Sequence, residues 1–305
     1  STRQKVEGIL ERSRYTPSIF ARGMVSGSMS TIGVLTIDVR DLYFGEVTYS
    51  IEHTFLEAGY NTILCNTGGL PQQQLHYLSL LTAKNVDGII LVGSVFDDRS
   101  FEAAVLEVSK SIPVVMLNRM LEGPNIRSVI CDEESGLKEC VSHLVRTGHE
   151  RIFYIRDTDT DSAMRKLAGF CAGMRKAGLD PDTIIETGKG LQGGIDAVAQ
   201  LSERGAEYTA LVTGDDVTAA GVCKGLRRIG RRPGIDTAVS GCNDSIIALS
   251  SEPELTSVDT RSRQMGETAV SVLSQVLKGE EPPAITMVKP VLSIRKSTLT
   301  LRTEQ

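Results

Sequence analysis

The chain has 305 residues, of which 41% are hydrophobic and 23% are charged, and its formal net charge is −5. This length exceeds one average domain and predicts two packed lobes. No apolar run approaches the roughly 18 residues of a membrane span, and no signal-peptide pattern opens the chain, so a membrane protein is excluded and a cytoplasmic location is expected. Six scattered cysteines without a Cys-x-x-Cys pair fit the same reducing compartment.

The charge is unevenly distributed along the chain. Residues 1–30 carry five basic and two acidic side chains, a net charge of +3, which leaves −8 for the remainder. A basic segment on an acidic body favours contact with a polyanion through that segment alone. A solvated terminus explains the same charge equally well.

The first half of the chain alternates strands with helices. Short β-branched runs predict strands over residues 31–38, 61–67, 87–93 and 113–118. Between the first two runs, apolar side chains recur at helical spacing at Phe44, Val47, Ile51 and Phe55. Gly59 suits the end of that helix, and Pro71 suits the first position of the next one.

A second series of strands begins near residue 151. It is predicted over residues 151–157, 183–188, 210–215 and 237–243, again with helices between. Strands buried on both faces and joined by helices form parallel sheets, so the fold class is α/β with two doubly wound parallel-sheet lobes.

The end of the chain predicts crossings between the lobes. A long helix over residues 261–278 is followed by two extended runs separated by Lys289 and Pro290. The chain can then return to the first lobe, add an edge strand and cross back. The predicted division is an N-terminal segment (1–30), a first lobe (31–147 with 258–288) and a second lobe (148–257 with 289–305).

Polar side chains follow most of the predicted strands. They are Asp38, Asn66, Asn118, Asp157, Asp215 with Asp216, and Asn243. Open α/β sheets bind ligands at these strand ends, and carboxylates, amides and the nearby rings of Tyr43 and Phe44 suit a polyhydroxylated ligand. Helix capping explains any single one of them more simply, whereas the whole set favours a site.

One glycine motif points toward a different function. The stretch GKGLQG (188–193) follows a predicted strand and matches the dinucleotide-binding pattern G-x-G-x-x-G, which would indicate an NAD-linked enzyme. Its position in mid-chain and the presence of Lys189 favour an ordinary turn. Nucleophile, phosphate-loop and metal-binding signatures are missing and the four histidines are scattered, so no enzyme, cofactor or metal is predicted.

Taken in order, several stretches resemble the LacI/GalR (lactose repressor) family of transcription regulators over nearly the whole chain. They are STRQKVEGILERSRYTPSIFARGM, TIGVLTIDVRDLYF, LEAGYNTILCNT, YLSLLTAKNVDGIIL, IPVVMLNR, HLVRTGHERIFYI, RKLAGFCAGM, LVTGDDVTAAGV, SVDT with MGETAV, and KPVLSIRKST. The resemblance implies a periplasmic-binding-protein-like core that binds a small effector between its lobes.

The resemblance also assigns the N-terminal segment to DNA. TRQKVEGILERS matches the last helix of the family's DNA-binding headpiece, and PSIFARGM matches its hinge helix. Met24 stands where an apolar wedge enters the minor groove, Arg22 stands beside the DNA backbone, and Ser18 belongs to the same contact. Because the recognition helix would precede residue 1, we expect this chain to be a fragment that binds operator DNA weakly or not at all.

The family's effector positions transfer onto eight residues of this sequence. They are Tyr43, Phe44, Asn118, Ser162, Lys166, Asp215, Asp216 and Asn243. Two depart from the usual pattern, because Lys166 replaces an arginine with its planar two-pronged grip and Asn243 replaces an aspartate. The pocket is therefore predicted without its ligand being copied from relatives.

The sequence thus predicts a dimeric regulator, most simply a repressor. Its effector is a small polar molecule, a sugar or sugar phosphate, that controls binding of the homodimer to operator DNA. The alternatives are a periplasmic-type sugar-binding protein, which shares the core, and the NAD-linked enzyme.

Overall fold

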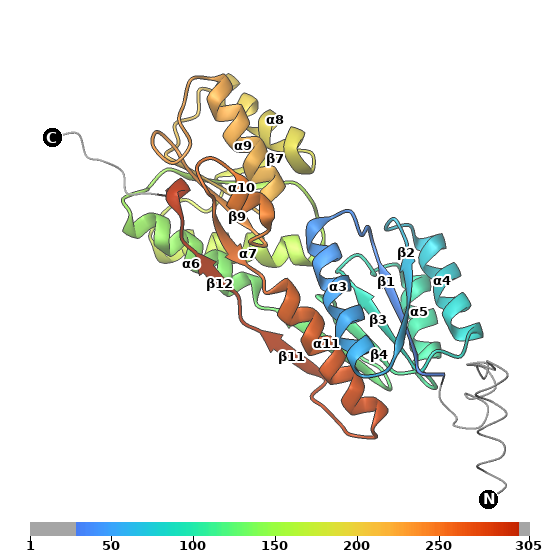
Figure 1. Cartoon of the computed structure of the whole chain (residues 1–305). Coiled ribbons are helices and arrows are strands. Elements are labelled where there is room, and N and C mark those ends of the chain that lie inside the picture. The colour runs from blue at the N-terminus through green and yellow to red at the C-terminus, as the bar shows by residue number, and fades with distance from the viewer. Residues whose placement is uncertain (1–28, 299–305) are drawn as a thin grey trace, which may run out of the picture.

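A computed structural model describes residues 29–298 of the chain. Within this range the strands form two separate six-stranded sheets, each covered by helices on both faces (Figure 1). We call the sheet that contains β1 (Thr31–Thr36), with its helices, the N-terminal lobe. The sheet that contains β6 (Ile152–Arg156), with its helices, is the C-terminal lobe. The predicted two-lobed α/β fold is confirmed.

The sheet of the N-terminal lobe is parallel throughout. Its strand order is β11 (Ile285–Val288), β5 (Ile126–Cys131), β4 (Val114–Leu117), β3 (Gly88–Val92), β1 and β2 (Asn61–Asn66). Its central strands are apolar on both faces, as the uninterrupted burial of β3 and β4 shows.

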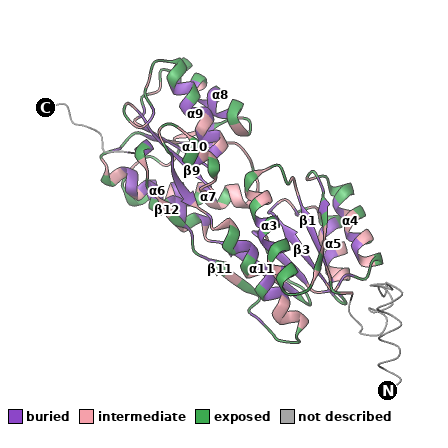
Figure 2. Cartoon of the chain, in the orientation of Figure 1, coloured by how far each residue is buried: buried purple, intermediate pink, exposed green. Residues whose placement is uncertain are grey.

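Helices cover both faces of this sheet. They are α3 (Leu42–Glu57) packed against α11 (Ser262–Leu277), and α4 (Pro71–Ala83) packed against α5 (Arg99–Val108). As predicted, α4 begins at Pro71 and Gly59 follows the end of α3 with a positive φ of 84°. Figure 2 shows buried residues lining the inner side of these helices.

The C-terminal lobe repeats the arrangement with one exception. Its strand order is β12 (Val291–Ser293), β10 (Thr256–Asp259), β9 (Ala238–Cys242), β8 (Ala210–Thr213), β6 and β7 (Ile184–Glu186). The edge strand β12 is antiparallel to β10, because it arrives directly from the other lobe through Lys289 and Pro290 without a helical crossover.

Helices again cover both faces of the second sheet. They are α6 (Glu133–Arg146) with α7 (Asp161–Lys176), and α8 (Gly190–Glu203) with α9 (Asp216–Arg228) and the short α10 (Ile246–Ser250); a 3₁₀ turn, η1 (Lys296–Thr298), follows β12. Five of the six cysteines are buried among these core residues of both lobes, and all six thiols are free.

Within residues 29–298 the chain passes between the sheets three times, after β5, after β10 and after β11. The predicted edge strand of the first lobe is β11, beside β5. The predicted boundary at residue 258 falls inside β10, whose ladder partners belong to the C-terminal lobe. These crossings place the carboxyl ends of both sets of strands on either side of one cleft.

Candidate functional site

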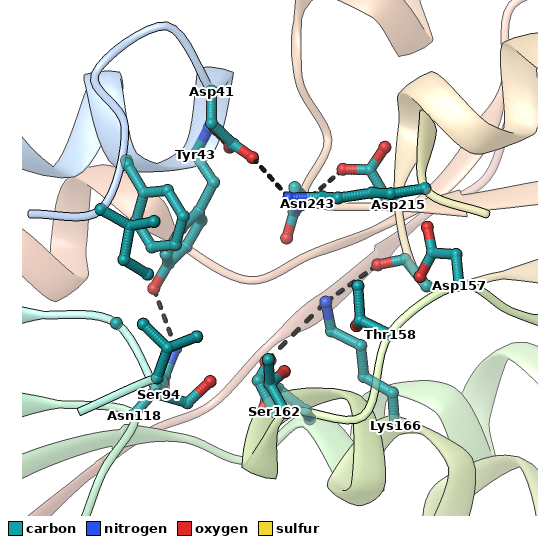
Figure 3. A pocket seen from close by; sticks show the side chains of 18 residues that line it. Asp41, Tyr43, Ser94, Asn118, Asp157, Thr158, Ser162, Lys166, Asp215 and Asn243 are labelled. Atoms are coloured by element: carbon teal, nitrogen blue, oxygen red, sulfur yellow. Dashed lines mark hydrogen bonds and ion pairs between the residues drawn. The ribbon is translucent and has the colours of Figure 1, made fainter. Parts of the chain in front are cut away.

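A polar cleft lies between the two lobes. Its volume is about 250 Å³, and both lobes contribute its walls. A neighbouring cavity of about 300 Å³ shares several of the same lining residues, among them Tyr43 and Asp215. Figure 3 shows the side chains converging on the cleft from the strand ends of both lobes. This is the position at which doubly wound sheets bind ligands.

The start of α3 forms one wall. Asp41 caps the helix and accepts a hydrogen bond from the backbone N–H of Tyr43 at 3.0 Å. Tyr43 and Phe44, in the first turn of the helix, pack edge to face with ring centroids 5.5 Å apart. Both line the cleft. They give it an apolar surface that can cover the face of a sugar ring.

Asn118 holds Tyr43 in place. Its φ of 58° is left-handed, a conformation that Asn adopts more readily than most residues. Its Oδ1 accepts from the backbone N–H of Cys131 at 2.9 Å, and its Nδ2 donates to the Tyr43 hydroxyl at 2.9 Å. Burial raises the pKa of Tyr43. One N–H and the oxygen of the Asn118 amide are therefore bonded within the N-terminal lobe, and Asn118 orients the ring that faces the ligand space.

The opposite wall begins with α7. Ser162 donates to a carboxylate oxygen of Glu133, and Lys166 donates to the carbonyl of Gly214 at 2.9 Å. Lys166 is only 8% exposed and lies 3.9 Å from the nearer oxygen of Glu133. Burial alone would lower the pKa of Lys166, but the acidic groups of Cys242 and Glu133 raise it above its ordinary value. Lys166 is thus a charged group held beneath the cleft.

Asp215 and Asn243 complete this wall. Oδ1 of Asp215 caps α9, accepting from the backbone N–H groups of Val217 at 2.7 Å and Thr218 at 3.2 Å. Its other oxygen accepts from Nδ2 of Asn243 at 3.4 Å. Burial raises the pKa of Asp215. Asp215 therefore caps α9 and also lines the cleft.

Asp216 does not line the cleft, which corrects its predicted place among the effector-contacting residues. It is 1% exposed. Its carboxylate accepts from the Ser257 hydroxyl at 2.6 Å, from the Ser245 backbone N–H at 2.7 Å and from the Ser245 hydroxyl at 2.9 Å. Since the second residue of a helix start points away from the first, Asp215 faces the cleft while Asp216 joins α9 to β10.

Four further charged residues line the cleft that were not among the eight positions transferred from the family. They are Asp41, Glu133, Asp157 and Lys189. Lys189 pairs with Asp41 of the other lobe at 3.2 Å. Only Asp157 carried a signal, its position at a strand end. Asp41 and Lys189 stand at helix starts 148 residues apart, and Glu133 follows the crossing between the lobes. No local sequence pattern indicates that these three residues meet.

Two arginines join the lobes beside the cleft. Arg119, after β4, bonds to Asp161 at the start of α7 and to Glu102 of its own lobe, the latter at 2.5 Å. Arg165 donates to the backbone carbonyl of Asn118 at 3.2 Å and to Glu133 at 2.9 Å. With the Lys189–Asp41 pair, these contacts tie the two walls together.

The glycine motif at residues 188–193 is a helix start. Gly190 opens α8 with a φ of 79°. A Cβ on Gly193 would lie 1.6 Å from the carbonyl oxygen of Gly188, so the absence of a side chain allows this tight turn. Gly190 and Gly193 thus meet local requirements of backbone geometry, which is what the turn interpretation expects.

Three predicted DNA-contacting residues, Ser18, Arg22 and Met24, lie outside the described residues. Within residues 29–298, no group of three or more His, Cys, Asp or Glu side chains is arranged to hold a metal ion. No helix in that range is both long and apolar enough to cross a membrane.

The comparison with known proteins identifies the family. Residues 29–296 match the family described as periplasmic binding proteins and the sugar-binding domain of the LacI family. An HTH-type transcriptional regulator of Lachnoclostridium phytofermentans is 31% identical over 97% of this chain and 90% of its own length. The ribose operon repressor of Escherichia coli is 30% identical over 88% of this chain and 82% of its own length.

A solved structure agrees with these matches. The lac repressor dimer bound to operator and an anti-inducer superposes with a TM-score of 0.87 at 25% identity, covering 98% of this chain and 90% of that one. The chain therefore belongs to the LacI family, and residues 29–298 form the ligand-binding core of a transcription regulator. Its relatives are regulators rather than enzymes.

Proposed function

We propose that the inter-lobe cleft binds a small polyhydroxylated effector, of the sugar class, and that this binding controls the association of a homodimer with operator DNA. One observation carries the proposal: carboxylates, two amides and two ammonium groups from both lobes converge with the rings of Tyr43 and Phe44 on one cavity of about 250 Å³. Polar groups pair with hydroxyls while rings cover the apolar face of a sugar. The name of the similar ribose operon repressor supports this class of ligand.

Lobe closure supplies the link to DNA. A ligand held by both walls favours the arrangement in which the Lys189–Asp41 and Arg119–Asp161 contacts are made. Binding at the cleft and at DNA must then affect each other equally, because coupling between two binding sites is reciprocal. We assign the DNA contact to residues 1–30, with Ser18, Arg22 and Met24 in the predicted hinge helix, and the homodimer by likeness to the lac repressor dimer.

Isothermal titration against pentoses, hexoses, their phosphates and nucleosides tests the effector. The best ligand is expected to lose at least tenfold in affinity in Tyr43→Ala, which removes the ring that lines the cleft. Tyr49→Ala is the matched control, because Tyr49 lies exposed on the same helix. Equal losses in both variants, or no binding of any compound, would contradict the proposal.

Sedimentation equilibrium tests the assembly. The 305-residue chain is expected to have the mass of a dimer at micromolar concentration, and a monomer would contradict the homodimer. NAD is expected to leave the melting temperature unchanged, whereas a shift would revive the NAD-linked enzyme.

A further inference from the structure

The charged groups of the cleft are not balanced. Six of them line it: the carboxylates of Asp41, Glu133, Asp157 and Asp215, and the ammonium groups of Lys166 and Lys189. When all six are ionised, the four negative and two positive groups leave a surplus of two negative charges, and Arg165 beside Glu133 reduces this surplus to one. The ion pairs decide which carboxylates have no charged partner in contact.

Both lysines are already matched. Lys189 forms its ion pair with Asp41 at 3.2 Å. Lys166 lies 3.9 Å from Glu133, which also binds Arg165 at 2.9 Å. These pairs account for both ammonium groups and for the carboxylates of Asp41 and Glu133.

Asp157 and Asp215 are left with neutral partners. Asp157 accepts from the Thr218 hydroxyl at 2.7 Å, and Asp215 accepts backbone N–H groups and the amide of Asn243. Within residues 29–298 neither carboxylate has an ion-pair partner within 4.0 Å, although Lys166 attracts Asp215 at longer range. Figure 3 shows both on the same side of the pocket. Burial raises the pKa of Asp215, and the charge of Asp157 adds to that rise.

Resting on the proposed function, we infer that the effector is a polyol that carries a protonated amine and no phosphate, with its ammonium group placed against Asp157 and Asp215. An ammonium group supplies the positive charge that these two carboxylates lack, and its three donors match their free acceptor positions. A phosphate ester would instead bring about 1.5 to 2 further negative charges, as on a phosphorylated side chain. The cleft already has a surplus of negative charge. To contact the phosphate, Lys189 would have to leave Asp41 and Lys166 would have to leave the carbonyl of Gly214.

The test compares matched triplets by titration calorimetry. Each triplet contains a free sugar, its amino-deoxy analogue and its terminal phosphate ester, for glucose, galactose and ribose. In the triplet that binds, the amine is expected to bind at least tenfold tighter than the free sugar, and the phosphate at least tenfold weaker. A phosphate that binds tighter than its parent, or an amine with no advantage in any binding triplet, overturns the inference while leaving the proposed function intact.

Two variants locate the effect. Asp157→Asn and Asp215→Asn are each expected to reduce the ratio of amine affinity to free-sugar affinity to less than threefold. Asp157→Asn keeps an oxygen that can accept from Thr218, and Asp215→Asn keeps one that can cap α9. Asp196→Asn, exposed on α8, is the control and should leave the ratio unchanged. An advantage that survives in both site variants overturns the assignment of the amine to these carboxylates. If no member of any triplet binds, the sugar assignment fails and the inference fails with it.

Discussion

The side-chain amide of Asn118 connects the end of β4 to Tyr43, whose hydroxyl lies 2.9 Å from its Nδ2. The other end of the same amide accepts the backbone N–H of Cys131 at 2.9 Å. One buried side chain, 4% exposed, thus sets both the position of the aromatic wall and the start of the crossing into the second lobe.

Replacement of Asn118 by Ala is expected to lower the free energy of unfolding by about 2–4 kcal/mol. About 1–3 kcal/mol comes from leaving a buried N–H without an acceptor, and about 1 kcal/mol from the left-handed backbone, which Ala tolerates poorly. Asn85→Ala is the control in urea unfolding, because Asn85 has a similar φ of 51° but is exposed. Equal losses in the two variants would show that the hydrogen bonds contribute nothing.

The two ion pairs between the lobes should differ in strength. Arg119 is 17% exposed and holds two carboxylates, so Arg119→Met is expected to cost about 1–3 kcal/mol in the free energy of unfolding. Lys189 is 58% exposed, so Lys189→Met is expected to cost less than about 1 kcal/mol. Urea unfolding of both variants at one salt concentration measures the difference. A larger loss for Lys189→Met would show that burial does not determine the ranking.

The stability of the C-terminal lobe should depend on pH through Asp216. Burial raises the pKa of this carboxyl to about 7, against the hydrogen bonds from Ser257 and Ser245, which lower it. In the unfolded chain the pKa of this carboxyl has its ordinary value of about 3.9. Between about pH 4 and pH 7 the folded state therefore binds more protons than the unfolded state. The free energy of unfolding therefore falls as the pH rises through this window, by up to about 4 kcal/mol from this group alone.

Asp216→Asn isolates this effect. The variant cannot ionise at this position. Between about pH 4.5 and about pH 7.5, the free energy of unfolding of the native chain should therefore fall relative to that of the variant. These two pH values lie on either side of most of the titration of a carboxyl group with a raised pKa. Urea unfolding at both pH values gives the difference. If the two proteins keep the same pH dependence, Asp216 does not titrate in this window.

Much of the fold follows from local patterns, whereas the site follows only in part. Strands such as β3 are apolar on both faces, which marks parallel sheets, and Pro71 marks a helix start. The neighbours Asp215 and Asp216 have the same chemistry in the sequence. Helix geometry alone sends one to the cleft and the other to the core.

No sequence pattern predicts the contacts between the two lobes. Lys189 and Asp41 lie 148 residues apart, and each stands at the start of a different helix. Their pairing depends on how three chain crossings set one lobe against the other. The charge balance of the cleft depends on that pairing, so the sequence alone does not indicate which carboxylates have no charged partner.

The glycines at the start of α8 provide the last prediction. Gly193→Ala is expected to lower the free energy of unfolding by about 1–3 kcal/mol, because the new Cβ would overlap the carbonyl oxygen of Gly188. Gly188→Ala is the control, since a Cβ there has no other atom within 4 Å and its φ lies outside the left-handed range. Thermal and urea unfolding compare the two. A dinucleotide site would make both changes alter NAD binding, whereas a tight turn makes only Gly193→Ala lose stability.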